Sequence, residues 1–180
     1  QVGKAEGDAS YENIANDAVY AGDVDGWIYG ARAGYRHQIN IIVVGISTDL
    51  NGSDVGGRGD DGFDGAFFDV NWFGSIDAQV GFSLERLLIY GIGGVAFAGI
   101  QHDYDSGTFG GNDNSYDEKT HTGFTIGAGV DFAVTEKVAL RLEARHYEFG
   151  TKEFGQVLDI IPHTVEADFQ TVTLGVEFKL

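Results

Sequence analysis

The sequence predicts an all-β fold, an eight-stranded antiparallel up-and-down β-barrel formed by one domain over residues 1–180. The final eight residues, 173–180, alternate apolar and non-apolar side chains up to the last position. Alternation with a period of two indicates a strand with two unlike faces. Six further segments alternate in the same way, and the connections between them are short and long in strict turn.

The alternating segments are the predicted strands, and they cover residues 27–37, 41–50, 66–83, 87–102, 122–134, 138–149 and 169–180. The connections around 38–40, 84–86 and 135–137 are short, whereas 51–65, 103–121 and 150–168 are long. Membrane barrels have tight turns on the periplasmic side, long loops on the outer side and an even number of strands. We therefore expect residues 9–26 to be another long outer loop. Residues 1–8 are then the outer end of a first strand that is truncated or distorted.

Composition excludes several other classes of protein. The chain contains 28 glycines and one proline, a ratio that argues against a disordered chain. A net charge of −17 argues against nucleic acid as a partner. The absence of cysteine excludes disulfides and thiolate metal sites. No run of about 18 apolar residues is present, which excludes a transmembrane helix, whereas a transmembrane strand needs only about 10 residues.

The non-apolar face of the strands has the properties of a barrel interior. It is rich in glycine, which weakens a solvated strand but makes room for long side chains in a narrow lumen. It also carries five basic and five acidic residues in a chain with 11 basic and 28 acidic residues, so basic residues are concentrated there. A closed lumen needs such pairing, because an unpaired buried charge is costly. The predicted lumen charge network consists of Arg32, Arg36, Asp49, Asp77, Asp131, Arg141, Glu143, Arg145, Glu177 and Lys179.

The apolar face has the properties of a surface that contacts lipid. Large aromatic residues lie towards the strand ends, as in the interfacial belts of membrane barrels: Trp27, Tyr29, Tyr35, Trp72, Phe82, Phe124, Phe132 and Phe178. Together with the polar face, this pattern predicts a transmembrane barrel in the outer membrane of a Gram-negative bacterium, in contact with lipid and lipopolysaccharide.

Four stretches resemble the outer-membrane β-barrel domain family of alphaproteobacteria, relatives of the small OmpA-type barrels. They are Gly26–Tyr35, Leu88–Ala96 with its Tyr-Gly-x-Gly-Gly pattern, Gly123–Asp131 with Gly-Ala-Gly-Val-Asp, and the final strand. The resemblance implies a packed, charged lumen and a mainly structural or surface role. It also implies that the final strand is read by the barrel assembly machinery through Thr173, Gly175, Phe178 and Leu180. Family members usually end in Phe rather than Leu, and they often carry an acid at the position of Ser47.

The outer loops suggest contacts with partners rather than catalysis or tight metal binding. Residues 156–166 are apolar for an outer loop, and such patches often mark contacts. A protein partner or a second copy would contact Val157, Leu158, Ile160 and Ile161, unless this loop folds over the barrel mouth. Acidic clusters at 60–64, 103–105 and 117–118, with Asp113, are interpreted as solvated loops that bind Ca²⁺ weakly at best. We predict no cofactor and no metal site.

Three functions remain open for such a barrel. The favoured one is a structural or surface-interaction role, with the lumen plugged by a static salt-bridge network. The alternative is a narrow ion-conducting channel, in which Arg141, Glu143 and Arg145 share one strand face and line a water path. A lipid-modifying barrel enzyme is disfavoured, because the five histidines are scattered and no Ser-His-acid set is evident.

Overall fold

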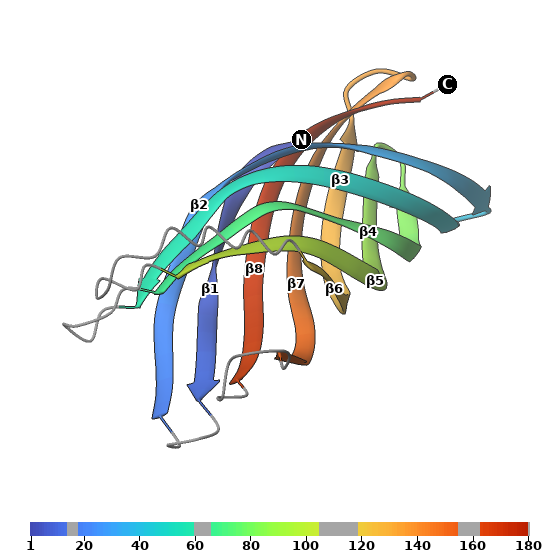
Figure 1. Ribbon diagram of the computed structural model, residues 1–180. Helices are drawn as coiled ribbons and strands as arrows, with labels where there is room; N and C mark the ends of the chain where they lie inside the picture. Colours follow the sequence, from blue (N-terminus) through green and yellow to red (C-terminus); the bar gives the residue numbers. More distant parts are fainter. Residues whose placement is uncertain (14–17, 60–65, 105–118, 155–162, 180) are drawn as a thin grey trace.

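The structure, a computed structural model, is a closed barrel of eight antiparallel strands, each paired with its neighbours in chain order (Figure 1). It describes residues 1–13, 18–59, 66–104, 119–154 and 163–179. The strands are β1 (Val2–Asn13), β2 (Ala18–Ile39), β3 (Ile42–Gly59), β4 (Ala66–Leu84), β5 (Leu87–Tyr104), β6 (Lys119–Ala133), β7 (Val138–Phe154) and β8 (His163–Phe178). The predicted fold class is therefore confirmed.

Three tight turns connect the strands at one end of the barrel, at the predicted positions. Asn40 and Glu85 have positive φ angles of 55° and 54° in the turns β2–β3 and β4–β5. Asparagine tolerates this left-handed conformation better than most residues. In the third turn, β6–β7, the hydroxyl of Thr135 accepts hydrogen bonds from the amides of Lys137 and Val138.

The strands run much further than the alternation predicted. Residues 9–13 and 18–26 belong to β1 and β2, so the prediction of a loop over 9–26 was wrong. The other outer connections are shortened in the same way, because β3, β5 and β7 extend to Gly59, Tyr104 and Phe154. Side-chain alternation arises where the two faces of a strand meet unlike surroundings, whereas backbone pairing can continue without it.

The first strand is the shortest of the eight at 12 residues, and it closes the barrel. It pairs with both β2 and β8, from Val2 opposite Tyr29 and Leu174 up to Asn13. Gln1 adds two backbone hydrogen bonds to Gly30, of 2.8 and 2.9 Å. Residues 31–39 of β2 and 175–178 of β8 lie nearer the tight turns, and among the described residues they pair on one side only.

The strands are staggered by ten residues round the barrel. Glu6 pairs directly with Asp25 of β2. Following the register from Glu6 the other way, through β8, β7, β6, β5, β4 and β3, leads instead to Tyr35 of β2, ten positions further along (35 − 25). Such a stagger makes the strands tilt, and eight tilted strands enclose a lumen that side chains can fill.

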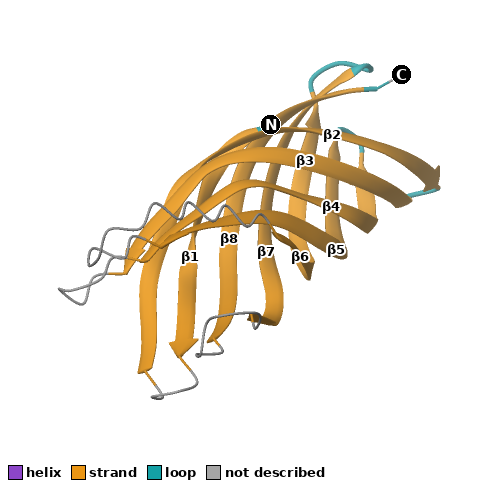
Figure 2. Cartoon of the chain, viewed as in Figure 1, coloured by secondary structure: helices purple, strands orange, loops and turns teal. Residues whose placement is uncertain are grey.

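Neighbouring residues on each strand face opposite sides of the wall, as expected. Ile76 is 61% exposed on the outside, whereas Asp77 is 2% exposed on the inside. The exposed outward residues of β2 to β8 are largely apolar, and the predicted aromatic positions Trp27, Tyr29 and Phe178 belong to this surface, whereas β1 places Lys4 and Glu6 outward. Figure 2 shows the described residues as strands joined by short turns. Within the described ranges, no helix is long and apolar enough to cross a bilayer.

Candidate functional site

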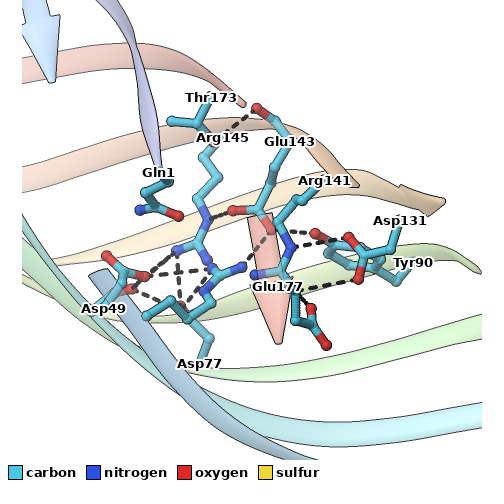
Figure 3. Close-up of polar contacts among 12 residues, drawn as sticks. Gln1, Asp49, Asp77, Tyr90, Asp131, Arg141, Glu143, Arg145, Thr173 and Glu177 are labelled. Atoms are coloured by element: carbon cyan, nitrogen blue, oxygen red, sulfur yellow. Dashed lines mark hydrogen bonds and ion pairs between the residues drawn. The ribbon is translucent and has the colours of Figure 1, made fainter. Parts of the chain in front are cut away.

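Nine of the ten predicted lumen charges meet inside the barrel, where they form two clusters (Figure 3). They come from β2, β3, β4, β6, β7 and β8, so residues far apart in sequence meet across the lumen. Strand parity explains why they point inward, since residues at i, i+2 and i+4 share a face. Arg141, Glu143 and Arg145 of β7 are the clearest case, and each is less than 9% exposed.

The cluster nearer the tight turns consists of Arg36, Asp131, Arg141 and Glu177, and it is called the periplasmic cluster because the predicted topology places the tight turns on that side. The Nη1 atom of Arg36 lies 2.6 Å from Asp131 Oδ2 and 3.1 Å from Glu177 Oε2. The Nε atom of Arg141 donates to Asp131 Oδ1 at 3.0 Å, and its Nη2 atom forms a close ion pair with Glu177. Two guanidinium groups thus face two carboxylates, and this cluster is balanced in charge.

The central cluster consists of Arg32, Asp49, Asp77, Glu143 and Arg145. Arg32 Nη1 donates to Glu143 Oε2 at 2.8 Å, and Arg145 Nε donates to Glu143 Oε1 at 2.6 Å. Arg145 Nη1 lies 3.0 Å from Asp77 Oδ2 and 3.1 Å from Asp49 Oδ2. Two guanidinium groups here face three carboxylates, and all five side chains are at most 7% exposed.

Tyr90 of β5 connects the two clusters. Its hydroxyl donates to Glu143 Oε2 at 2.6 Å, and the guanidinium groups of Arg36 and Arg141 lie 5.5 and 5.9 Å from its ring centre. Cations at such distances are attracted to an aromatic face. The ring lies against Gly129, where a Cβ atom would collide with it. Glycine at this position of β6 therefore lets the tyrosine lie flat across the lumen.

Uncharged polar groups complete the central cluster, and they were not among the predicted site residues. Ser75 Oγ lies 2.7 Å from Asp49 Oδ2 and 2.7 Å from Asp77 Oδ2. Asn51 Nδ2 donates to Asp49 Oδ1 at 2.7 Å, and Gln1 Nε2 donates to Asn51 Oδ1 at the same distance. Ser75 and Asn51 each lie two positions from a predicted acid on the same strand. The two-residue repeat of a strand could therefore have predicted that they point into the lumen.

An aromatic layer fills the lumen on the outer side of the central cluster. Phe73, Tyr147, Phe149 and Phe169 are at most 3% exposed. The ring of Phe73 meets those of Tyr147 and Phe169 edge-on, with ring centres 5.2 Å apart in both pairs. The rings of Tyr147, Phe149 and Phe169 stack on one another. This layer was not predicted, although continuing the parity of Arg145 outward leads directly to Tyr147 and Phe149.

The periplasmic end of the lumen is more open. A cavity of about 760 Å³ is lined there by Arg36, Asp131, Arg141 and Glu177, together with residues of the tight turns. Glu177 is the most exposed acid of the two clusters, at 23% of its side chain. Arg36 and Glu177 are therefore partly accessible from that side, whereas Asp131 and Arg141 are buried.

Other predicted site residues lie apart from this network. Lys179 is exposed at the end of β8, and among the described residues its side chain pairs with no acid. Of the predicted assembly residues, Thr173 faces the lumen, Gly175 is half-buried, Phe178 is exposed, and Leu180 lies outside the described residues. Ser47 is buried, and its hydroxyl has no partner among the described residues.

The predicted loop sites fall largely outside the described part of the barrel. The partner loop residues Val157, Leu158, Ile160 and Ile161 lie outside the described residues. So do most residues of the acidic clusters, at 60–64, 105, 113 and 117–118. Within the described part of the chain, no group of three or more His, Cys, Asp or Glu residues has the arrangement of a metal site.

Comparison with known proteins gives a consistent result over the whole chain. Residues 2–179 match the family described as outer membrane protein beta-barrel domain. The 31 kDa outer-membrane immunogenic protein of Brucella melitensis biotype 1 is 31% identical over 183 residues, which cover 95% of this chain and 75% of that protein. The 22 kDa outer membrane protein of Rhizobium leguminosarum bv. viciae is 32% identical over 148 residues. That match covers 81% of this chain and 63% of the relative.

Solved structures with similar folds are more distant in sequence. Neisserial surface protein A is 16% identical with a TM-score of 0.42, over 95% of this chain and 94% of that one. Ail, the attachment invasion locus protein of Yersinia pestis, is 13% identical with a TM-score of 0.41, over 95% and 96% of the two chains.

Proposed function

This chain belongs to the outer membrane protein beta-barrel domain family and resides in the outer membrane of a Gram-negative bacterium, where we propose that it is a structural and surface-interaction protein with a plugged lumen. The observation that supports this proposal is the set of buried side chains inside the barrel. The central cluster and the aromatic layer follow one another along the lumen, and both consist of buried side chains. An ion crossing this barrel would have to displace paired charges and then pass a dry aromatic layer.

Both layers oppose conduction for physical reasons. Each guanidinium of the central cluster contacts all three carboxylates of that cluster, so an entering ion must replace several charge-assisted hydrogen bonds. The aromatic layer offers no hydration to a passing ion, and hydrophobic constrictions close pores by excluding water. Under this proposal the cavity near the tight turns is a vestibule that leads to the central cluster, whose Arg32 belongs to its lining.

A narrow ion-conducting channel is the second candidate, because that periplasmic cavity is lined by charged groups. Planar-bilayer recordings separate the two functions. The sample must first be shown to be folded by its heat-dependent gel mobility. We expect no steady single-channel openings. Steady, ion-selective openings would contradict the plug, and neutralising Arg141, Glu143 and Arg145 would then identify the charges that set the selectivity.

We place the surface role in the connections opposite the tight turns. The Brucella relatives are named immunogenic proteins, which suggests by analogy that this chain also presents its long connections outside the cell. An epitope tag inserted within residues 105–118, between β5 and β6, should bind antibody on intact cells. The matched control is the same tag in the 135–137 turn, which should be labelled only after the outer membrane is permeabilised. The reverse pattern would contradict this orientation.

A further inference from the structure

The central cluster holds one carboxylate more than its guanidinium groups can balance. Arg32 and Arg145 supply two positive charges, whereas Asp49, Asp77 and Glu143 supply three negative ones if all are ionised. The periplasmic cluster is balanced and does not compensate for this excess. An uncompensated buried charge costs several kcal/mol, and in practice such a group takes up a proton instead. The central cluster therefore calls for one additional positive charge.

The hydrogen bonds of Ser75 indicate where that charge lies. Its Oγ atom lies 2.7 Å from one carboxylate oxygen of Asp49 and 2.7 Å from one of Asp77, and it accepts a hydrogen bond from Arg145 Nη1 at 3.0 Å. A serine hydroxyl carries a single proton, so it can donate to only one of the two. The second contact is as short as the first, and it is a hydrogen bond only if the other carboxyl group carries the proton. The excess negative charge and the short contact of Ser75 thus both indicate a proton on Asp49 or Asp77.

Asp77 is the acid with the fewest donors. Glu143 accepts hydrogen bonds from Arg32, Arg145 and Tyr90. Asp49 accepts from Asn51 on Oδ1 and from Ser75 and Arg32 on Oδ2. Among the described residues Asp77 accepts on Oδ2 alone, from Ser75 and from Arg145 Nη1 at 3.0 Å. By contrast, the Oδ1 atom of Asp77 has no hydrogen-bond partner among the described residues, although its side chain is fully buried. An unpartnered oxygen is much less costly on a neutral carboxyl group than on an ionised one.

We propose that Asp77 is a proton-binding site that stays occupied at neutral pH inside the barrel. The Oδ2 hydroxyl of the protonated Asp77 donates to Ser75 Oγ, and the hydroxyl of Ser75 donates in turn to Asp49 Oδ2. With this one proton the central cluster is neutral, as the periplasmic cluster already is.

The groups packed round Asp77 from every side are consistent with this state. Arg32 of β2 and Arg145 of β7 are its only cationic neighbours within 4 Å among the described residues, and both also contact Asp49 and Glu143. Tyr147 of β7 lies 3.4 Å from Arg145 Nη1 through its neutral hydroxyl. The backbone nitrogen of Gln1 on the β1 side donates to the carbonyl oxygen of Gly30.

Infrared spectroscopy of the folded protein in lipid vesicles tests this assignment directly. An ordinary aspartate loses its proton at about pH 4, so a folded barrel at about pH 7 should show no buried protonated carboxyl band unless such a site exists. We expect one carbonyl stretching band of a protonated carboxyl group at that pH, with a shift on transfer to D₂O. A spectrum without this band would overturn the proposal, and this first measurement needs no variant.

Two variants then locate the proton. Asp77→Asn removes the group that carries it, and Asp49→Asn removes the excess negative charge, so that Asp77 ionises. Each variant should lose the band completely. Glu177→Gln is the matched control, since it alters an acid of the periplasmic cluster, and the band should remain at full intensity. Heat-dependent gel mobility identifies the folded samples.

Two further outcomes would overturn the proposal. A band that persists in Asp77→Asn would place the proton on another acid. A band that appears only when Na⁺ is removed from the buffer would mean that a metal ion, and not a proton, supplies the missing charge.

Discussion

Replacing Arg145 with alanine is expected to lower the free energy of unfolding by about 3–5 kcal/mol, the usual cost of removing one partner from a buried ion pair. Arg145 is 3% exposed in its side chain and contacts all three acids of the central cluster. Without it, three carboxyl groups face the single guanidinium of Arg32. Urea unfolding in lipid vesicles, followed by the fluorescence of Trp27 and Trp72, measures the change.

The matched control for Arg145 is Lys179→Ala. Lys179 is also a cation of the predicted network, but it is exposed and its side chain pairs with no acid of the described residues. Its removal should change the stability by less than about 0.5 kcal/mol, as is usual for surface substitutions. Equal effects of the two substitutions would contradict the view that pairing inside the lumen stabilises this barrel.

Phe73→Ala is expected to have the second large effect, lowering the free energy of unfolding by about 3–5 kcal/mol. Phe73 is fully buried and contacts the rings of both Tyr147 and Phe169. Its loss removes a packed ring and leaves a cavity in the aromatic layer, which neighbouring rings on rigid strands cannot fill. The same urea unfolding experiment applies, because both tryptophans remain in place.

Phe82→Ala is the control for Phe73, on the same strand but on the lipid side. Phe82 is 56% exposed on the outer surface, so lipid chains occupy the space that its ring leaves. The variant then loses only the free energy of transferring the ring from water to lipid, and no free energy is lost to a cavity. We expect a clearly smaller destabilisation than for Phe73→Ala. If Phe73→Ala lowered the free energy of unfolding no more than Phe82→Ala does, the aromatic layer would be loosely packed and the prediction wrong.

The two faces of the barrel wall were predictable from the sequence only where the wall crosses the bilayer. The lipid face was predicted correctly from Trp27 to Phe178, because a bilayer demands apolar residues at every second position. The same rule placed nine of the ten charges in the lumen. It failed for residues 9–13 and 18–26, which are strands although their sequence shows no regular alternation. Backbone hydrogen bonds join those segments to their neighbouring strands, and such pairing does not require any pattern of side-chain polarity.

The sequence by itself determined the fold class, the direction of each strand face, the three tight turns and the membrane in which this protein resides. These features depend on local periodicity and on the solvent that each face meets. Only the tertiary structure decided which charges pair. The stagger of ten residues brings Arg145 of β7 against Asp49 of β3 and Asp77 of β4. Such contacts depend on the register of all eight strands at once. For the same reason, the charge excess of the central cluster and the aromatic layer became evident only in the closed barrel.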